Sequence, residues 1–501
     1  MEHFDVVIIG AGLSGVGAGY RLQKRCPGKK YVILEARDQI GGTWDLFRYP
    51  GVRSDSDMFT YAYPFRPWKG AKVLADGPTI LNYVRDTACV YGIDRHIRFG
   101  HRVQSASWSS EDARWTVEVS NGSATQRFTC DFLYGCTGYY RYDAGYEPAF
   151  PGSERFRGQI VHPQHWPENL HYAGKKVVVI GSGATAVTLV PAMAPAAGHV
   201  TMLQRSPSYM LSLPDHDSVA DLLRRRLPEG AAHWIARWKN IFLNLWIYQM
   251  SRRAPNVMSR MLRDGAVKTL PQGYAVDKHF KPRYQPWDQR LCLIPNFDLF
   301  KAIRDGRASV VTDQIETFTE HGIRLQSGQE LEADIIVTAT GLQMLAIGGL
   351  NLGVDGKQIH AGEAFVYKGA MLSNVPNFAF CIGYTNASWT LRADLASTFV
   401  CRLLNYMDRR GYRTCAPICD SAGMEPRPLL SLTSGYVLRA AANLPKQSAK
   451  QPWVIKQNYI LDMLMMKLSR MEDGVLRFGK LPVTTRVELP REVTTASRFG
   501  D

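Results

Sequence analysis

One glycine pattern, Gly-x-Gly-x-x-(Gly or Ala), occurs twice in this chain of 501 residues. The first copy runs from Gly10 to Gly15 after the apolar run 4–9, and the second from Gly181 to Ala186 after the run 176–180. A helix-like segment follows each copy. A glycine turn between a buried strand and a helix is typical of the first βαβ unit of a doubly wound sheet. Two copies therefore predict an α/β fold with two doubly wound, Rossmann-like domains.

The first copy has the features of a dinucleotide site. Gly10 permits the tight turn, Gly12 lets the backbone approach a pyrophosphate, and Gly15 lets helix and strand pack closely, while the helix N-terminus faces the phosphates. Glu35 ends the next predicted strand, where a carboxylate accepts hydrogen bonds from a ribose. The carboxylate favours an unphosphorylated ribose, so this site is predicted to bind FAD or NAD.

After the second copy, the next predicted strand ends in Arg205 and Ser206, a cation and a hydroxyl, where the first unit has the acid Glu35. This combination is suited to a ribose 2′-phosphate, so the second site is predicted to bind NADPH. Its predicted contacts are Gly181, Gly183, Thr185, Ala186, Arg205 and Ser206. Two further strand ends, 136–138 and 338–341, also combine a small residue with glycine. Together with the two glycine patterns, these strand ends, which include Thr340 and Gly341, are typical of enzymes that bind both FAD and a pyridine nucleotide.

The remaining patterns suggest how the chain is divided. Residues 101–138 resemble a β-meander, 145–158 are rich in Pro and Gly, and 216–285 are helix-like and rich in Trp and Arg. We expect a first part of the FAD-binding domain at 1–142, a linker at 143–160, an NADPH-binding domain at 161–345 with a mostly helical insert at about 212–285, and a second part of the FAD-binding domain with a C-terminal tail at 346–501.

The formal net charge of +15 indicates that the protein binds anionic partners. No nucleic-acid motif is present, so we expect no nucleic-acid partner, and two bound dinucleotides offer a simple explanation. An alternative is weak attachment to an anionic membrane surface through 234–248, where aromatic and aliphatic residues mix with cations. No apolar run of about 18 residues and no secretion signal are present, which favours a cytoplasmic protein. The oligomeric state is left open.

The nine cysteines are scattered without a Cys-x-x-Cys pair or histidine partners. They predict neither a metal site nor the redox dithiol that a two-dinucleotide disulfide reductase needs.

Two segments narrow the reaction class. The first, 41–55, fits the pattern [A/G]GxWxxxx[F/Y]P[G/M]xxxD at every defined position, and the second, 156–167, fits FxGxxxHxxxWP. Both resemble fingerprints of class B flavoprotein monooxygenases of the Baeyer–Villiger type, and among these the mycobacterial ethionamide-activating monooxygenases. The second fingerprint is carried by Phe156, Gly158, His162, Trp166 and Pro167.

The resemblance implies FAD, NADPH and O2 as reactants, with one oxygen atom inserted next to a ketone carbonyl to give an ester or lactone. The family's active-site arginine aligns with Arg290 and its acidic partner with Asp55. A guanidinium fixed by a carboxylate stabilises the negative charge that develops during oxygen transfer.

Further positions carry family roles. Gly42, Thr43 and Trp44 are expected near the flavin, as is Asp55. Asn386, Ser388 and Trp389 are expected near the flavin's second contact segment or the substrate pocket. His162 is expected to serve conformational coupling between domains more than proton transfer.

One departure from the family pattern and one alternative reaction remain. Many Baeyer–Villiger enzymes have Lys directly before the catalytic arginine, where this chain has Gln289, so NADPH selectivity would depend more on Arg205. The alternative is an N- or S-oxygenating enzyme on the same scaffold, against which Trp166 and Arg290 argue. The Trp-rich insert favours small apolar ketones or thioethers as substrates, with sulfide oxidation as a second activity.

Overall fold

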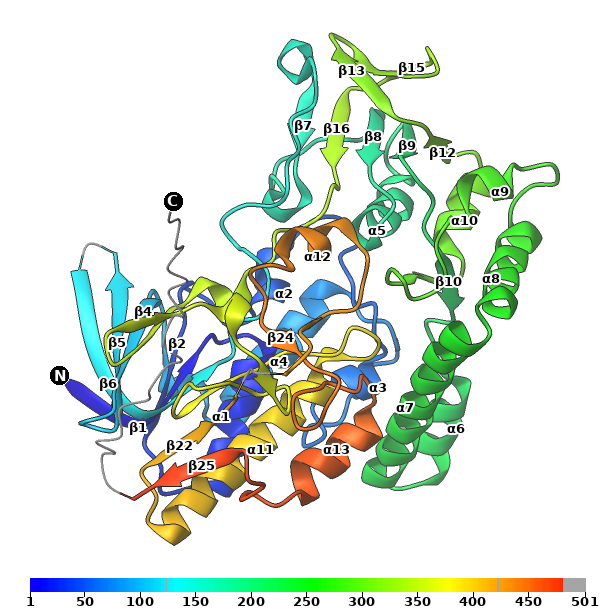
Figure 1. Cartoon of the computed structure of the whole chain (residues 1–501). Helices are drawn as coiled ribbons and strands as arrows, with labels where there is room; N and C mark the ends of the chain where they lie inside the picture. The colour runs from blue at the N-terminus through cyan, green and yellow to red at the C-terminus, as the bar shows by residue number, and fades with distance from the viewer. Residues whose placement is uncertain (123, 421–422, 481–501) are drawn as a thin grey trace, which may run out of the picture.

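The structure is a computed structural model that describes residues 1–122, 124–420 and 423–480. It contains two large sheets, several small ones, and a group of helices beside the second large sheet (Figure 1). The predicted α/β fold with two Rossmann-like sheets is confirmed. The part of the expected C-terminal tail beyond residue 480 lies outside the described residues.

The first sheet has nine strands in the order β18-β17-β4-β5-β6-β1-β2-β3, with β21 paired to β6. Its parallel part is formed by β1, β2, β3, β6 and β21, and the antiparallel part includes the expected meander of β4, β5 and β6. Val6, Val7 and Ile8 of β1 are fully buried, as expected for a central parallel strand covered on both faces. The strands are β1 (Glu2–Ile9), β2 (Tyr31–Leu34), β3 (Ile97–Arg98), β4 (Arg102–Ser109), β5 (Arg114–Asn121), β6 (Ala124–Gly135), β17 (Asn351–Val354), β18 (Lys357–Ile359) and β21 (Phe378–Phe380).

Helices pack against the first sheet. The apolar faces of α1 (Leu13–Arg25) and α11 (Trp389–Arg410) contact each other and share one core with β1. The others near this sheet are α2 (Thr43–Leu46), α3 (Met58–Tyr61) and α4 (Gly77–Val90). Because β17, β18, β21 and α11 come from the C-terminal third, the first sheet joins two distant parts of the sequence.

The second sheet is fully parallel, in the order β12-β9-β8-β16-β7. Its strands are β7 (Gln159–Val161), β8 (Lys176–Ile180), β9 (His199–Gln204), β12 (Ala308–Thr312) and β16 (Ile335–Thr338), and its helices are α5 (Ala184–Met193) and α10 (Asp298–Arg304). A small antiparallel sheet lies at one end, formed by β13 (Ile315–Thr319), β14 (Gly322–Leu325) and β15 (Glu330–Glu332).

The expected helical insert forms α6 (Ser218–Arg226), α7 (Glu229–Arg253), α8 (Pro255–Thr269) and α9 (Val276–His279), bounded by the paired strands β10 (Met210–Leu213) and β11 (Cys292–Pro295). The buried side chain of Arg237 on α7 donates hydrogen bonds to the carbonyls of Phe59 and Ala62 at the end of α3, at 2.7 and 2.9 Å. Since a helix C-terminus carries unpaired carbonyls and partial negative charge, this contact attaches the insert to the first sheet's helices.

The C-terminal segment, expected to end in a tail, contains regular helices and strands. It contains α12 (Gly435–Ala440) and α13 (Tyr459–Leu468), of which α13 packs on α11. Short strand pairs complete it: β19 (Val366–Tyr367) with β20 (Met371–Leu372), β22 (Thr414–Pro417) with β25 (Leu476–Gly479), and β23 (Arg427–Pro428) with β24 (Lys446–Gln447).

Candidate active site

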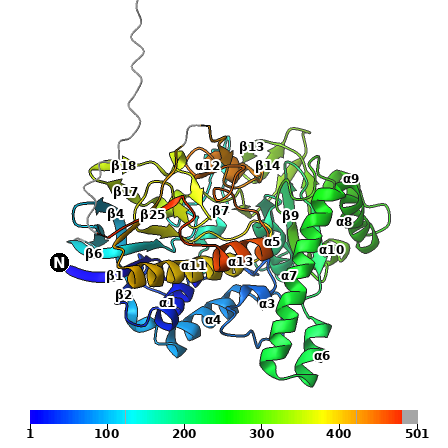
Figure 2. The same cartoon turned by 60° about the horizontal axis from the view of Figure 1, so that its bottom comes forward.

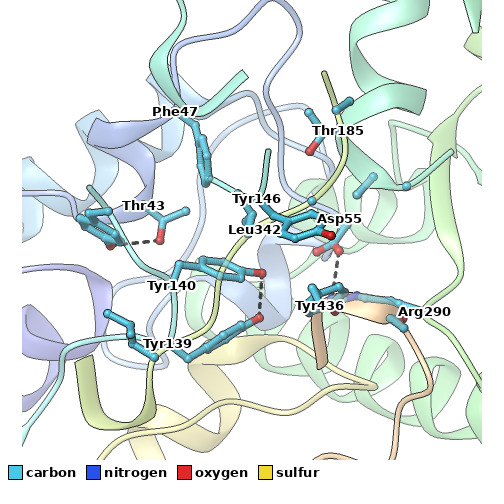
Figure 3. Close-up of a pocket in the computed structure, with 18 of the residues that line it drawn as sticks. Thr43, Phe47, Asp55, Tyr139, Tyr140, Tyr146, Thr185, Arg290, Leu342 and Tyr436 are labelled. Atoms are coloured by element: carbon cyan, nitrogen blue, oxygen red, sulfur yellow. Dashed lines mark hydrogen bonds and ion pairs between the residues drawn. The ribbon is translucent and has the colours of Figure 1, made fainter. Parts of the chain in front are cut away.

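A cleft of about 1470 Å³ lies where the carboxyl ends of the two sheets face each other. Both glycine turns line it, together with Asp55 and Arg290 (Figure 3). Ligands of open α/β sheets bind beyond the carboxyl ends of the strands. The remaining predicted residues that line the cleft are Glu35, Gly42, Thr43, Trp44, Thr185, Arg205, Ser206, Thr340 and Gly341.

The two glycine turns are built alike. Gly10 has a φ of +101°, and a Cβ there would lie 2.7 Å from the carbonyl oxygen of Cys136. Gly181 has a φ of +138°, and a Cβ there would lie 2.4 Å from the carbonyl oxygen of Ala339. In each sheet, therefore, the glycine turn packs against the end of a neighbouring strand, which is the close approach expected at 136–138 and 338–341.

The geometry of both helix N-termini fits a pyrophosphate. Gly12 and Gly183 are the N-cap residues of α1 and α5, and neither helix has a capping side chain. A Cβ on Gly183 would have no atom within 4 Å, and on Gly12 the nearest atom would be 3.6 Å away, so each turn leaves open space beside it. The first N–H groups of a helix are unpaired and carry partial positive charge. Both ends can therefore hold phosphate groups.

Glu35 directly follows β2 and is held beside the first glycine turn. Its carboxylate accepts hydrogen bonds from the N–H groups of Ala11 at 2.6 Å and Arg37 at 2.9 Å. Burial raises the Glu35 pKa above its ordinary value, although these two donors counteract the increase. The carboxylate lines the cleft, so its position fits a ribose beside the first turn.

The second turn has basic and polar surroundings instead. Arg205 and Ser206 follow β9 and are exposed, and Arg205 forms no salt bridge within the part of the chain that the structure describes. Gln289 lines the same cleft. A free guanidinium beside a hydroxyl fits the 2′-phosphate of a ribose.

Arg290 and Asp55 meet inside the cleft. The Nη2 atom of Arg290 lies 3.0 Å from Oδ2 of Asp55, and the two side chains are 30% and 36% exposed. Burial alone would lower the Arg290 pKa, but the Asp55 carboxylate, followed by the neighbouring Tyr139 and Tyr436, holds it above its ordinary value. The guanidinium therefore keeps its charge at any physiological pH.

Sequence reasoning missed a group of tyrosines around this pair. The hydroxyls of Tyr139 and Tyr140 are 3.0 Å apart, and the hydroxyl of Tyr142 lies 3.3 Å from Oγ1 of Thr43 (Figure 3). Tyr436 reaches the cleft from α12. Burial raises the pKa of Tyr142 to about 12, so its hydroxyl stays protonated. The available signal was the Tyr-Tyr-Arg-Tyr run directly after the strand end 136–138.

The second family fingerprint lies behind the cleft rather than in it. Its residues Phe156, Gly158, His162, Trp166 and Pro167 are absent from the lining. The buried His162 ring lies against Gly145, where a Cβ would be 2.0 Å from Cε1. The side-chain amide of Gln164 donates to the carbonyls of Arg141 and Tyr142, both at 2.9 Å. This fingerprint thus supports the segment that carries the tyrosines.

Three other predicted cofactor residues also lie outside the cleft lining. A Cβ on Gly15 would lie 1.8 Å from the carbonyl oxygen of Gly10, which agrees with its predicted role in close helix–strand packing. Ala186 is fully buried in the core of the second sheet. The side-chain N–H of the buried Asn386 donates to the carbonyl of Gln457 at 2.8 Å, and its Oδ1 has no partner among the described residues.

Cleft residues with internal partners include Trp44 and Thr340. The indole N–H of Trp44 donates to the Tyr61 hydroxyl at 2.6 Å, and Oγ1 of Thr340 donates to the Tyr146 carbonyl at 2.6 Å. Their orientation is therefore set by the protein itself.

Comparisons with known proteins give consistent results. Residues 4–227 match the family model described as flavin-binding monooxygenase-like. The chain is 55% identical over 487 residues to the FAD-containing monooxygenase EthA of Mycobacterium tuberculosis, which covers 97% of this chain and 100% of the relative. It is 49% identical to the probable FAD-binding monooxygenase AlmA of Acinetobacter baylyi, with 96% and 97% covered.

Solved structures with the same fold include an oxidised steroid monooxygenase bound to NADP, with a TM-score of 0.73, 23% identity, and coverage of 95% of this chain and 100% of that one. A cyclohexanone monooxygenase in an open form gives a TM-score of 0.73 at 21% identity, with the same coverage.

Proposed function

Since the chain belongs to the family of FAD-containing flavin monooxygenases, we propose that it is a Baeyer–Villiger enzyme that uses NADPH and O2. It would insert one oxygen atom next to a ketone carbonyl and release an ester or lactone. The observation that carries the proposal is the Arg290–Asp55 ion pair, which lies in the cleft shared by both glycine turns. The relatives and the solved structures confirm the family resemblance inferred from the two fingerprint segments.

The two cofactors are assigned by the chemistry of the two turns. FAD would lie on Gly10, Gly12 and Glu35, in a domain formed by 1–142 and 346–501, and NADPH on the second turn, in the domain 161–345. Bound FAD, once reduced by NADPH, supplies the activation of O2. The free Arg205 supports the choice of NADPH over NADH, because NADH has no 2′-phosphate to pair with it.

Arg290 would act as an electrostatic catalyst. Its raised pKa means that it holds its proton throughout, so it stabilises negative charge without transferring a proton. Negative charge develops on the transferred oxygen and on the former carbonyl oxygen, and a fixed cation in a partly dehydrated cleft stabilises both. Asp55 would orient the guanidinium, and the hydroxyls of Tyr139 and Tyr140 add neutral hydrogen-bond donors nearby.

The substrates we propose are small apolar ketones, with thioethers as a second class. Apolar side chains such as Trp44, Phe47 and Leu342 line the cleft beside its polar groups. A thioether needs no stabilisation of an adduct anion, so its oxidation would depend less on Arg290 than ester formation does.

The direct test supplies FAD-loaded protein with NADPH, isotopically labelled O2, a panel of ketones and one thioether, and follows the label by mass spectrometry. Label in an ester or lactone supports the proposal. Label in a sulfoxide alone would instead favour an oxygenase of soft nucleophiles. Peroxide formation without any labelled organic product would contradict a monooxygenase acting on this substrate class.

A further inference from the structure

The long helix α7 exposes an apolar face. The side chains of Trp234, Phe242 and Trp246 are 61%, 55% and 52% exposed, and their spacing places them on one side of the helix. Trp238 joins them, with its ring 6.1 Å from that of Trp234 and 5.7 Å from that of Phe242. Soluble proteins rarely expose contiguous aromatic surface of this kind without a binding partner.

The neighbouring helix α13 adds a second row of exposed apolar side chains. Its first residue, Tyr459, packs on Trp238 with ring centroids 6.1 Å apart, and Figures 1 and 2 both show the two helices side by side. Leu461, Leu464 and Leu468 follow at helical spacing and are all exposed. The α7–α13 face consists of Trp234, Ile235, Trp238, Phe242, Trp246, Tyr459, Leu461, Leu464 and Leu468.

Unpaired cations border the face. Residues 218–253 contain seven Lys and Arg but only two acids. Both acids are paired, Asp221 with Arg224 at 3.7 Å and Glu229 with Lys69 at 3.0 Å. Exposed cations without a salt bridge to any described residue include Arg225 and Arg226 at the end of α6, Arg253 at the end of α7, Lys467 on α13 and Arg470 just beyond it.

We propose that the α7–α13 face docks on an anionic lipid bilayer. Tryptophan and leucine side chains would enter the headgroup boundary, while the bordering arginines pair with lipid phosphates. The contact is peripheral, because no helix among the described residues is long and apolar enough to cross a membrane. A second copy of the chain fits less well, since a twofold contact would bring two sets of unpaired arginines together.

The face is also close to the cleft. On the inner side of α7, Ile241 packs with Tyr384 and Leu391, and Tyr384 itself lines the cleft. The side chains on the inner side of α7 therefore lie between the proposed lipid surface and the cleft, so an apolar substrate dissolved in the lipid could reach the cleft from there. Delivery of a substrate from the lipid rests on the proposed function, whereas lipid binding does not and is measured separately.

The experiment is co-sedimentation of the full-length, FAD-loaded protein with phosphatidylcholine vesicles prepared with or without phosphatidylglycerol. The test variant is Trp234→Ser/Phe242→Ser/Trp246→Ser. The matched control, Val90→Ser/Ile160→Ser, removes exposed apolar side chains from α4 and β7. A charge variant, Arg225→Gln/Arg226→Gln/Arg253→Gln, tests the cations.

We expect the wild-type protein and the matched control to bind anionic vesicles and to bind neutral ones far less. The apolar variant should bind at least about tenfold more weakly, and the charge variant about fivefold more weakly per cation removed. Absence of vesicle binding, or equal binding by the test variant, would overturn the proposal. So would a wild-type dimer in sedimentation velocity that the apolar variant converts to monomer, because the face would then be covered by a second copy. FAD content and flavin reduction by NADPH show that each variant is folded.

Discussion

The guanidinium of Arg290 and the carboxylate of Asp55, far apart in the sequence, lie 3.0 Å from each other at the junction of the two sheets. Asp55 comes from the loop before α3, beside the first sheet, and Arg290 lies two residues before β11 at the end of the helical insert. The pair therefore forms only when the insert is docked, and it couples the placement of one positive charge to the relative position of the two nucleotide-binding units.

Arg290→Ala is expected to separate the two halves of the reaction. Flavin reduction by NADPH should stay within about twofold of wild type, whereas ester formation should fall by at least about 100-fold, the loss typical of removing one group that stabilises developing charge. Stopped-flow absorbance of the flavin measures the first, and product analysis under labelled O2 measures the second.

Two further variants sharpen this test. Arg290→Lys keeps the charge but not the planar donors, so it should recover only part of the ester yield. Asp55→Asn keeps the cation but loosens its orientation, and should reduce activity less than Arg290→Ala. Ester formation by Arg290→Ala at a near wild-type rate would remove Arg290 from the mechanism.

The glycines of the two turns are predicted to respond differently to the same substitution. In Gly183→Ala the new methyl group meets no protein atom within 4 Å, so the fold should be unchanged, while the KM for NADPH rises by about tenfold because the pyrophosphate can no longer approach. In Gly15→Ala the methyl group would lie 1.8 Å from the Gly10 carbonyl oxygen. That variant should lose about 1–3 kcal/mol or more of stability and bind less FAD. Thermal unfolding and FAD content distinguish the two, and an unstable Gly183→Ala would contradict the assignment.

Much of this site could be predicted because its parts are local. Gly10, Gly181, Glu35 and Arg205 each occupy a position fixed by a strand–turn–helix pattern within a few dozen residues, and the structure places all four at the cleft. Ligand-binding turns of this kind are encoded by sequence spacing alone.

The rest depends on contacts between distant segments. Tyr436 reaches Arg290 only because the C-terminal segment forms α12 above the cleft, and no local pattern indicates where such a segment packs. Asn386 depends on a distant segment in the same way, because its side-chain amide N–H donates to the Gln457 carbonyl, and its predicted place near the flavin stays a prediction. The sequence of 234–248 showed that α7 carries many aromatic and aliphatic side chains. Which of them are exposed could not be predicted, because that depends on which side of the helix packs against the rest of the protein.

Nucleotide selectivity is predicted to follow two positions. Arg205→Gln removes a free cation beside the second turn and should lower kcat/KM for NADPH by about 10- to 100-fold, the effect of losing a charged hydrogen bond. Gln289→Lys adds a cation to the same cleft and should raise kcat/KM for NADPH by several-fold. Neither change should alter kcat/KM for NADH, since NADH lacks the 2′-phosphate. Equal losses with both nucleotides would show that Arg205 contacts a part that they share.

Acid sensitivity is predicted to depend on His233 of α7. Its ring is buried and both ring nitrogens lack hydrogen-bond partners. Burial, followed by the charges of Arg237 and Arg224, lowers its pKa from 6.5 to about 4. The unfolded chain therefore binds a proton that the folded chain excludes between these two pH values, so stability falls as the pH drops below 6.5, by about 1.4 kcal/mol per pH unit down to pH 4.

His233→Gln should reduce this loss, seen as a smaller decrease of the unfolding temperature between pH 7 and pH 5. The exposed His321 gives the matched control, because His321→Gln removes a histidine that is solvated in both states. The same decrease in both variants and the wild type would assign the acid sensitivity to other groups. A smaller decrease in His233→Gln alone would show that protonation of His233, one helical turn before Arg237 on α7, destabilises the folded chain.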